Sequence, residues 1–489
     1  MAESEAPITV SIASGQCRDG ITKVQVSVNT ISEGVRQASD IACVLDVSGS
    51  MGSEATIVGA SGQSESHGLS LLDVAKHGVR TIMNALSDSD RLSIIAFNHA
   101  AQVVLHPTAM DEAGKKEAED SIEKLNSGGG TNIWAGLLAG MDALRGKASE
   151  GRLGHVMLLT DGESQDRATI VPNMLDYKQQ HEGLPGTINT FGFGYNLDSK
   201  LLVEMSLAGS GSYSFIPDAG FVGTCFVSML SQVLVTAGRE VYLQLDKDDA
   251  AELVEPLVHG NWSVEDKGDF WNIGVGTLQY GQSKDLVFPM RLKPEAELCA
   301  SLRYEDSARK QVEARSVVVK MSESQGAADL GVEEQWCRCT FVEALVQAQK
   351  LTAESRSEEA VKKALQVLMD ASEKVKASPA AETPNVKALL EDVTGQSTEA
   401  LSKQEWYFRW GTHYLPSVMF AHKLQMCNNF KDPGVQHYGG ELFRKLRDEA
   451  DDIFCKLPAP KPTARSYGYS GGASAAPVSM AAYHDRCSG

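Results

Sequence analysis

The feature that most limits the fold of this chain is an alternation of apolar runs with helical patterns between residues 38 and 237. Strand-like runs occur at Ile41–Leu45, Leu92–Phe97, Val103–Leu105, Val156–Leu159, Ile188–Phe193 and Tyr213–Ile216. Helical patterns separate them, near 69–86, 111–125, 132–144, 169–181, 198–207 and 220–236. The first and fourth runs are continuously apolar, which is expected of strands that are covered on both faces. The alternation therefore predicts an α/β domain over 38–237, with a doubly wound and mostly parallel sheet.

A second pattern, in which apolar residues alternate with polar ones, flanks this segment on both sides. It occurs at Ile8, Val10, Ile12, Val24, Val26 and Val28, and again at Val241, Leu243, Leu245, Leu298, Ala300 and Leu302. Such alternation is typical of half-buried strands. Because an isolated hairpin is only marginally stable in water, residues 1–37 are predicted to pair with strands of a β-sandwich at 238–322. The α/β domain would then be inserted in that sandwich.

The last third of the chain is predicted to be a helical domain over 328–457, followed by a tail. Helical segments rich in Ala, Gln, Glu and Lys lie at 332–353, 357–376, 384–404 and 440–456. An aromatic cluster at Trp406–Trp410 fits a core better than a ligand platform, because one helix face cannot present five consecutive residues. Residues 458–489 are rich in Pro, Gly, Ser and Ala, and we expect a disordered tail there because little apolar area is available for burial.

The net charge of the chain limits the kinds of partner that are expected, and its targeting signals and cysteines bear on its location. The chain has 45 Lys and Arg against 64 Asp and Glu, a formal net charge of −19. A surface this acidic repels phosphate backbones and anionic lipid, so neither nucleic acid nor a membrane surface is expected as a partner. The sequence shows no signal peptide and no apolar run near the roughly 18 residues of a membrane span. With nine cysteines in no disulfide-like spacing, we expect a cytoplasmic protein with reduced thiols.

Three short, oxygen-rich motifs follow strands of the predicted α/β domain or precede one of its helices. They are Asp46-Val-Ser48-Gly-Ser50-Met51, Gly128-Gly-Gly-Thr131-Asn132 and Thr160-Asp161-Gly162. Loops at the carboxyl ends of neighbouring parallel strands converge on one crevice, so two carboxylates and three hydroxyls are predicted to meet there. Oxygen-only ligands suit a hard cation such as Mg²⁺, with Mn²⁺ and Ca²⁺ also open, whereas Zn²⁺ would favour His or Cys. The sequence therefore predicts a metal site at Asp46, Ser48, Ser50, Thr131 and Asp161.

These motifs resemble the metal-ion-dependent adhesion site of von Willebrand factor A (VWA) domains, and the resemblance covers about residues 38–237. All five positions of that site are filled in the expected order. The resemblance implies that Ser48, Ser50 and Thr131 offer hydroxyls to the metal, while Asp46 and Asp161 act directly or through water. It also implies that one coordination position stays open for an acidic side chain of a protein partner.

The helical region resembles another domain, the extension that follows VWA domains in proteins that also carry Hedgehog/intein-type (Hint) domains. The resemblance rests on Trp410-Gly-Thr-His-Tyr-Leu-Pro416, on Ala421-His422 and on Cys427-Asn-Asn-Phe-Lys-Asp-Pro-Gly434, and it covers roughly 328–457. A Hint domain begins at a cysteine. Only two residues follow Cys487, so we expect no self-processing domain here.

Several weaker signals have simple structural interpretations. Gly52–Gly68 is a long connection beside the predicted metal site, and such loops are uncommon unless they are functional or disordered. We hypothesise that it shapes partner choice; a surface insertion without a role is the alternative. Cys337 and Cys339 are two apart on a predicted helix and point in nearly opposite directions, so one core and one surface thiol are expected. No zinc-finger spacing links the residues of one further group, which we expect in turns or in the core: His413, His422, Cys427 and His437.

Enzyme chemistry finds little support in the sequence. Ser50 and Gly52 match half of a nucleophile elbow, but Ser48 stands where that motif needs Gly. The chain has no phosphate-binding Gly-x-x-x-x-Gly-Lys loop and no His-Glu-x-x-His motif. The leading hypothesis is a non-enzymatic, intracellular module that binds a partner's acidic side chain through Mg²⁺. The alternative is a ubiquitin-pathway adaptor or scaffold that uses the helical C-terminal region, and a metal-dependent hydrolase is the third class.

Overall fold

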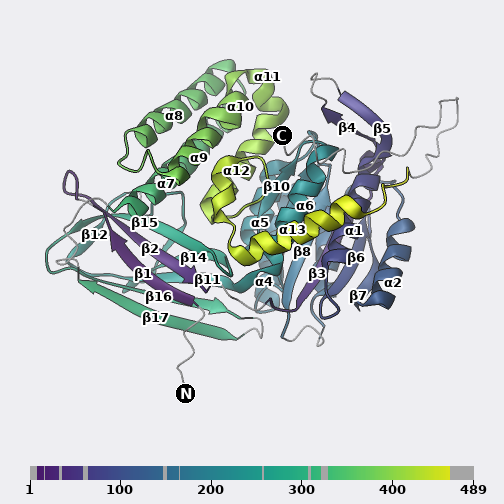
Figure 1. Ribbon diagram of the computed structural model, residues 1–489, viewed down its shortest axis with the longest axis horizontal. Helices are drawn as coiled ribbons and strands as arrows, with labels where there is room; N and C mark the ends of the chain where they lie inside the picture. The colour runs from purple at the N-terminus through teal and green to yellow at the C-terminus, as the bar shows by residue number, and fades with distance from the viewer. Residues whose placement is uncertain are drawn as a thin grey trace. The chain divides into compact units, whose positions relative to one another are not determined.

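A computed structural model describes residues 8–15, 17–31, 36–58, 64–146, 151–164, 166–255, 258–306, 310–320 and 329–462. The chain forms two compact units, each assembled from separate stretches of sequence (Figure 1). The first unit takes its residues from 1–35, 235–427 and 432–443. The second takes its residues from 36–234, 428–431 and 444–489.

The second unit is built on a six-stranded sheet with the strand order β10-β9-β8-β3-β6-β7. Its strands are β3 (Ser39–Asp46), β6 (Arg91–Phe97), β7 (Ala101–Ala109), β8 (Leu153–Thr160), β9 (Thr187–Phe193) and β10 (Tyr213–Ile216). All neighbours are parallel except β6 and β7, which are antiparallel. Every residue of β3 and β8 is buried, which explains why their sequences are continuously apolar. The predicted α/β fold with a mostly parallel sheet is confirmed.

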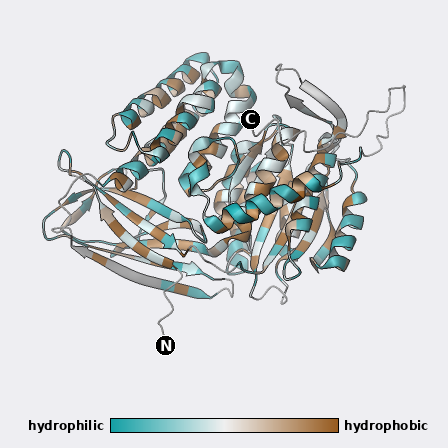
Figure 2. Cartoon of the chain, viewed as in Figure 1, coloured by the Kyte–Doolittle hydropathy of each residue, from teal (hydrophilic) through white to brown (hydrophobic). Residues whose placement is uncertain are grey.

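Six helices accompany this sheet at the places where the sequence predicts them. They are α1 (Leu71–Ala85), α2 (Glu112–Glu123), α3 (Ile133–Ala143), α4 (Arg167–Gln180), α5 (Ser199–Ala208) and α6 (Val222–Leu234), with short 3₁₀ turns η1 (Gly49–Gly52) and η3 (Ala219–Phe221). The start of α1 is fixed by a capping box between Ser70 and Asp73. In Figure 2 the strands of the sheet are largely brown, whereas α2 is mostly teal, as expected for a helix with a solvated face.

The predicted loop at 52–68 is partly a hairpin, so that prediction is wrong in part. Strands β4 (Glu54–Val58) and β5 (Ser64–Ser70) pair antiparallel, with Thr56 opposite Ser66. The strand-forming tendency of Thr56-Ile57-Val58 accounts for β4, because β-branched residues favour an extended backbone. Residues 59–63 lie outside the described part of the chain.

The first unit contains a sandwich of two antiparallel sheets, ordered β1-β2-β15-β12 and β13-β14-β11-β16-β17. The strands are β1 (Ile8–Ser14), β2 (Thr22–Thr30), β11 (Thr236–Asp246), β12 (Ala251–Leu253), β13 (Val264–Asp266), β14 (Phe270–Gln279), β15 (Ser283–Leu292), β16 (Glu297–Glu305) and β17 (Gln311–Lys320). Strand β2 pairs with β15, with Val26 opposite Leu286. The N-terminal hairpin thus completes a sheet whose other strands follow the α/β segment.

The helices after residue 329 are α7 (Leu330–Glu354), α8 (Glu358–Lys376), α9 (Pro384–Asp392), α10 (Thr398–Ser402), α11 (Gln404–Trp406), α12 (Thr412–Leu424) and α13 (Glu441–Lys456). Irregular turns η5 (Val393–Ser397), η6 (Tyr407–Gly411) and η7 (Pro433–Tyr438) lie between them. The single helix predicted at 384–404 is broken, because Gly395 has a non-helical backbone with ψ of −117°. Helix α12 was not predicted, since Pro416 in its interior weakens the helical pattern.

The range 328–457, predicted as one helical domain, is divided between the two units. Helix α13 lies across α6 and α1 in Figure 1, and its side chains Ala450 and Phe454 join the core of the α/β unit. A Cβ atom on Gly223 of α6 would come within 2.6 Å of the Phe454 ring. Glycine at this position therefore permits the close approach of the two helices.

Other sequence expectations meet a mixed outcome. Cys337 and Cys339 are both buried, so the expectation of one surface thiol is wrong; α7 packs against α8, α12 and β15, which leaves neither position in solvent. The eight cysteines in the described ranges are all free thiols.

Of the aromatic cluster, only Tyr407 is fully buried. Within the described ranges, each helix is too short or too polar to cross a membrane. The tail predicted at 458–489 is described only as far as residue 462.

Candidate metal-binding site

The site begins with two carboxylates at the same edge of the central sheet. Asp46 is the last residue of β3, and Asp161 directly follows β8. These two strands are parallel neighbours, with Leu45 opposite Leu159, so both chains leave the sheet side by side. The sheet topology therefore brings together two residues that are more than one hundred positions apart in the sequence.

The two serines of the first motif link these carboxylates. Ser50 Oγ donates a hydrogen bond of 2.8 Å to Asp161 Oδ1, and it lies 3.0 Å from Ser48 Oγ. Asp46 Oδ1 accepts the backbone N–H of Ser48 at 2.8 Å. Since Ser48 is followed by the 3₁₀ turn η1, the chain bends tightly enough for both hydroxyls to face the same point.

Thr131 reaches the same point through the glycine-rich loop. The N–H of Gly49 donates to the carbonyl of Gly129 at 3.0 Å, and the N–H of Gly128 donates to the carbonyl of Val47 at 2.8 Å. A Cβ atom built on Gly162 would lie 3.4 Å from Thr131 Oγ1 and 4.0 Å from Ser50 Oγ. The structure thus gathers all five side chains that the sequence singled out, while their role as metal ligands stays a prediction.

Two residues that are not among the five predicted ligands support the site. Thr160 Oγ1 donates to Asp46 Oδ2 at 2.5 Å and so orients that carboxylate. Asn98, just after β6, donates from Nδ2 to the carbonyl of Gly128 at 2.9 Å and accepts the N–H of Asn132 on its own carbonyl at 2.6 Å. The signal available in the sequence was their position, because each lies at the carboxyl end of a strand of the same sheet.

Both carboxylates of the site have raised pKa values. Burial raises the pKa of Asp46, against the hydrogen bonds from Ser48 and Thr160. Burial also raises the pKa of Asp161 to about 6; the Ser50 hydrogen bond opposes this shift, and the nearby charge of Asp46 adds to it. Within the described residues, neither carboxylate has a basic side chain as a partner. Two buried acids therefore lie close together with no positive charge to balance them.

The donor set fits a hard divalent cation. It consists of two carboxylates and three hydroxyls, which are oxygen ligands of the kind that Mg²⁺ takes together with water. No cluster of three or more His, Cys, Asp or Glu side chains with metal-site geometry occurs in the described ranges. The candidate site has only two acidic side chains and draws its other oxygens from Ser and Thr.

Comparison with known families identifies two domains in the chain. A family model for the von Willebrand factor type A domain matches residues 41–163, which include all five side chains. The chain carries a VWA domain. A second family model, described as VWA / Hh protein intein-like, matches residues 383–452. The extension domain expected from the sequence is therefore also present, over a shorter range than the resemblance suggested.

Solved structures show the same fold. The VWA protein of Catenulispora acidiphila superposes with a TM-score of 0.56 at 15% identity, over 80% of this chain and 91% of that one. The ArnB paralog VWA2 of Sulfolobus acidocaldarius gives a TM-score of 0.53 at 16% identity, over 86% and 99% of the two chains. At this level of identity the likeness concerns the fold alone.

The chain spans only part of the length of the curated relatives that it matches. The uncharacterized protein sll0103 of Synechocystis sp. is 26% identical over 286 residues, which cover 54% of this chain and 66% of that protein. The E3 ubiquitin-protein ligase WAV3 of Arabidopsis thaliana is 22% identical over 232 residues, or 46% of this chain and 29% of WAV3. Each match thus spans only part of the relative.

Proposed function

We propose that the VWA domain is a metal-dependent protein-binding module without catalytic activity. Asp46, Ser48, Ser50, Thr131 and Asp161 would hold one divalent cation, with Mg²⁺ expected. The observation that carries the proposal is the pair of buried carboxylates with no basic partner among the described residues. A bound cation would supply the missing positive charge and attract an Asp or Glu side chain of a partner.

Each residue of the site has a distinct part in this proposal. Thr160 and the backbone of Ser48 fix the carboxylate of Asp46, so that its position is set before any ion arrives. Ser50 donates its hydroxyl hydrogen to Asp161, which leaves the lone pairs of Oγ available to ligate the ion. The chain carries a net charge of −19, which opposes an acidic partner at long range. Binding would therefore depend on the local positive field of the ion.

The hairpin β4–β5 is the best candidate for selecting the partner. It starts two residues after η1, which carries Ser50, and it ends where α1 begins. Replacing residues 55–67 by a short Gly-Ser linker is expected to change the affinity for the partner and to leave metal affinity unchanged. Equal partner affinity in the shortened and full-length proteins would show that the hairpin has no such role.

Metal binding is tested by titrating the full-length protein with Mn²⁺, whose free ion is counted by electron paramagnetic resonance. One site per chain is expected, and excess Mg²⁺ should displace the Mn²⁺. Asp161→Ala should abolish binding. Asp176→Ala, which removes the same charge from an exposed position of α4, should not. Retention of the site in Asp161→Ala would refute the proposed ligands.

The open position is tested with acetate as the smallest model of an Asp side chain. Water-proton relaxation by the bound Mn²⁺ reports the water molecules that the ion retains. Acetate at millimolar concentration should lower this relaxation, whereas acetamide, which is neutral, should have less effect. Unchanged relaxation with both compounds would mean that the ion offers no position to a partner's carboxylate.

A second candidate function is a ubiquitin-pathway adaptor or scaffold that uses the helical C-terminal region. The similarity to WAV3, whose name describes an E3 ubiquitin-protein ligase, favours this candidate. Partners of such an adaptor should remain bound in EDTA and to Asp161→Ala. Deleting 328–489 is a poor test, because it would remove Arg338 and Gln425 from their hydrogen bonds to β15.

Both candidates include a cytoplasmic location as part of the proposal. Cell fractionation tests it, and recovery of the protein in a secreted or membrane fraction would contradict it.

A further inference from the structure

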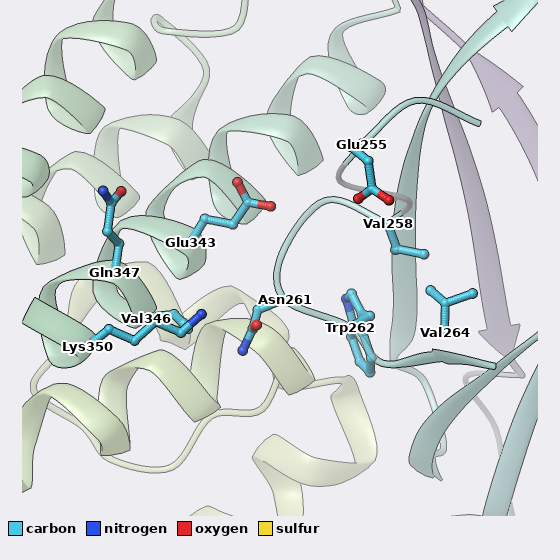
Figure 3. A pocket seen from close by; sticks show the side chains of 9 residues that line it. All are labelled: Glu255, Val258, Asn261, Trp262, Val264, Glu343, Val346, Gln347 and Lys350. Atoms are coloured by element: carbon cyan, nitrogen blue, oxygen red, sulfur yellow. The ribbon is translucent and has the colours of Figure 1, made fainter. Parts of the chain in front are cut away.

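A cavity of about 470 Å³ lies in the first unit, which takes its residues from 1–35, 235–427 and 432–443 and is called the sandwich-and-helix unit below. None of the five side chains of the candidate metal site lines it. This volume falls in the range of about 300–1,000 Å³ that is typical of ligand pockets. Figure 3 shows its lining, which consists of Glu255, Val258, Asn261, Trp262, Val264, Glu343, Val346, Gln347 and Lys350. One wall is the segment that leads into β13, and the other is one face of α7.

The two walls differ in chemistry along the cavity. Trp262, Val258 and Val264 form an apolar surface, and Val346 faces them from α7 (Figure 3). The carboxylates of Glu255 and Glu343 lie at one end of the view. The residues on α7 are spaced three or four apart, which places them on a single face of that helix. Lys350 in the same lining offsets one of the two acids, so the cavity keeps a net negative charge beside its apolar middle and favours an amphipathic cation.

The wall formed by residues 258–262 is held in place by hydrogen bonds from three elements. The N–H of His259 donates to the carbonyl of Val287 at 2.8 Å, and Lys423 Nζ donates to the carbonyl of Asn261 at 2.9 Å. The N–H of Gly260 donates to Glu343 Oε1 at 3.0 Å. Asn261 has a φ of 61°, a left-handed backbone that costs energy and persists only where the surroundings impose it. The cavity is therefore preorganised.

Glu343 is ionised and has one oxygen to spare. Burial would raise its pKa, but His259 and the N–H of Gly260 outweigh that effect and lower the pKa below its usual value. Both contacts fall on Oε1, which lies 2.8 Å from His259 Nδ1. Neither Glu343 Oε2 nor the carboxylate of Glu255 has a partner among the described residues. These two acids can therefore accept hydrogen bonds from a cation.

Two side-chain amides in the cavity lining indicate a second property of the ligand. Asn261 and Gln347 line the cavity, and neither amide group has a hydrogen-bond partner in the described ranges. An amide offers both a donor and an acceptor, which matches the carbonyl and N–H groups of an extended peptide. The chain's charge of −19 also draws a basic segment toward it.

We propose that this cavity binds a short peptide segment in which an Arg or Lys lies next to an apolar residue. The basic side chain enters between Glu255 and Glu343, the apolar side chain packs on Trp262 and Val346, and the peptide backbone meets Asn261 and Gln347. This site is independent of the proposed metal site and does not require a divalent cation.

Isothermal titration calorimetry of the full-length protein with acetyl-Leu-Arg-Leu-amide tests the proposal. The same peptide with citrulline, which is uncharged and nearly isosteric with Arg, is the matched ligand. The Arg peptide should bind about tenfold more tightly, the difference expected for a charge-assisted hydrogen bond. Equal affinity for the two peptides, or no saturable binding of either, would overturn the proposal.

Variants locate the binding site. Glu255→Gln should weaken binding of the Arg peptide about tenfold, and the side chain at this position is exposed. Glu252→Gln, which removes the same charge from a nearby residue outside the cavity, should leave the affinity unchanged. Val346→Trp should block binding by filling the cavity. Equal weakening by both Gln variants, undiminished binding in a folded Val346→Trp protein, or loss of binding in EDTA would each contradict the proposed site.

Discussion

Asp161 in the VWA domain and Asp285 in the sandwich-and-helix unit are both buried, yet their surroundings differ. Among the residues that the structure describes, Asp161 receives one side-chain hydrogen bond, from Ser50, and its close neighbour is another acid, Asp46. Asp285 accepts four side-chain hydrogen bonds, two on each oxygen. They come from Gln25 at 2.9 Å, Ser27 at 2.6 Å, Ser283 at 2.8 Å and Gln425 at 2.6 Å.

The backbone and the cations around Asp285 are arranged just as completely. Arg338 donates to the carbonyl of Asp285 at 2.5 Å and to that of His422 at 2.9 Å. Lys284 donates to the carbonyl of Leu424, and burial, together with the charge of Arg338, lowers its pKa to about 7. Both carboxylate oxygens of Asp285 and its backbone carbonyl thus have hydrogen-bond donors.

The difference indicates what each cluster is for. A buried carboxylate with four donors fixes strands and helices to one another, because losing it would leave those donors unsatisfied. A buried pair of carboxylates with few donors and no cation adds nothing to stability by itself. The second arrangement makes sense as a site whose missing charge is supplied by a ligand.

The largest expected effect is on the stability of the sandwich-and-helix unit. Asp285→Ala should lower its free energy of unfolding by about 3–5 kcal/mol, because four donors lose their acceptor and the buried Lys284 loses a neighbouring negative charge. Hydrogen exchange read by mass spectrometry in increasing urea, on peptides from β15, measures the change for that unit alone.

The matched variant is Asp161→Ala in EDTA, read on peptides from β8. Removing an unbalanced buried charge should change the stability of the VWA domain by only about 0–1 kcal/mol. If the two variants lost equal stability, the contrast between a structural and a ligand-binding carboxylate would be wrong.

A smaller effect is expected from the metal itself. Mg²⁺ at one hundred times its dissociation constant should stabilise the VWA domain by about 2.7 kcal/mol, since it binds only the folded state. Exchange of β3 and β8 peptides in Mg²⁺ and in EDTA gives this increment. Asp285→Ala should keep the full increment although its other unit is weakened, and Asp161→Ala should have none. An increment that survives in Asp161→Ala would assign the metal elsewhere.

The two clusters also differ in how visible they are in the sequence. Most side chains of the candidate metal site follow strands whose continuous apolar runs are easy to recognise, so their meeting point could be inferred from sheet topology. The partners of Asp285 are Gln25, Ser27 and Gln425, which lie up to 260 positions away and have no common spacing. No local pattern encodes their contact, because it depends on how a helix end packs on a sheet.

The same limit explains the errors in the secondary structure. Apart from the hairpin β4–β5, the strands and helices of the VWA domain follow hydrophobic periodicity and were predicted to within a few residues. Helix α12 contains Pro416, and its residues from Leu415 to Leu424 are all buried, so no amphipathic pattern marks it. Gly395 interrupts a segment whose sequence is otherwise helical. In both places tertiary packing overrides the local signal.

A second buried pair, Asp392 and His422, tests through its pH dependence whether two opposite pKa shifts cancel. Asp392 Oδ2 lies 2.9 Å from His422 Nε2, and both side chains are fully buried. Burial raises the pKa of Asp392 to about 7 and lowers the pKa of His422 to about 3. Relative to unfolded values of about 3.9 and 6.5, the folded state gains a proton on Asp392 and loses one on His422. Between about pH 4 and 6.5 these two terms cancel.

Asp392→Asn removes the carboxyl group whose raised pKa offsets the lowered pKa of His422. Because the pKa of His422 is lower in the folded state than in the unfolded state, the free energy of unfolding then falls by about 1.4 kcal/mol for each pH unit below 6.5. Urea unfolding at pH 7.5 and pH 5.5, compared between variant and wild type, measures the difference. The pair would not be compensating if wild type and Asp392→Asn lost stability equally over this range.

The smallest effect on stability, and the sharpest test of the site's geometry, is expected from Gly162→Ala. Its added methyl would lie 3.4 Å from Thr131 Oγ1 and 4.0 Å from Ser50 Oγ, which are ordinary contacts, so the metal-free domain should change by less than about 0.5 kcal/mol. The methyl would nevertheless crowd the space that these hydroxyls share, and Mn²⁺ affinity should fall about tenfold. Gly128→Ala is the control, since nothing lies within 4 Å of its added Cβ. If Gly162→Ala bound Mn²⁺ as tightly as Gly128→Ala, the ion could not lie between the hydroxyls of Thr131 and Ser50, and the unbalanced charge of Asp161 would need another explanation.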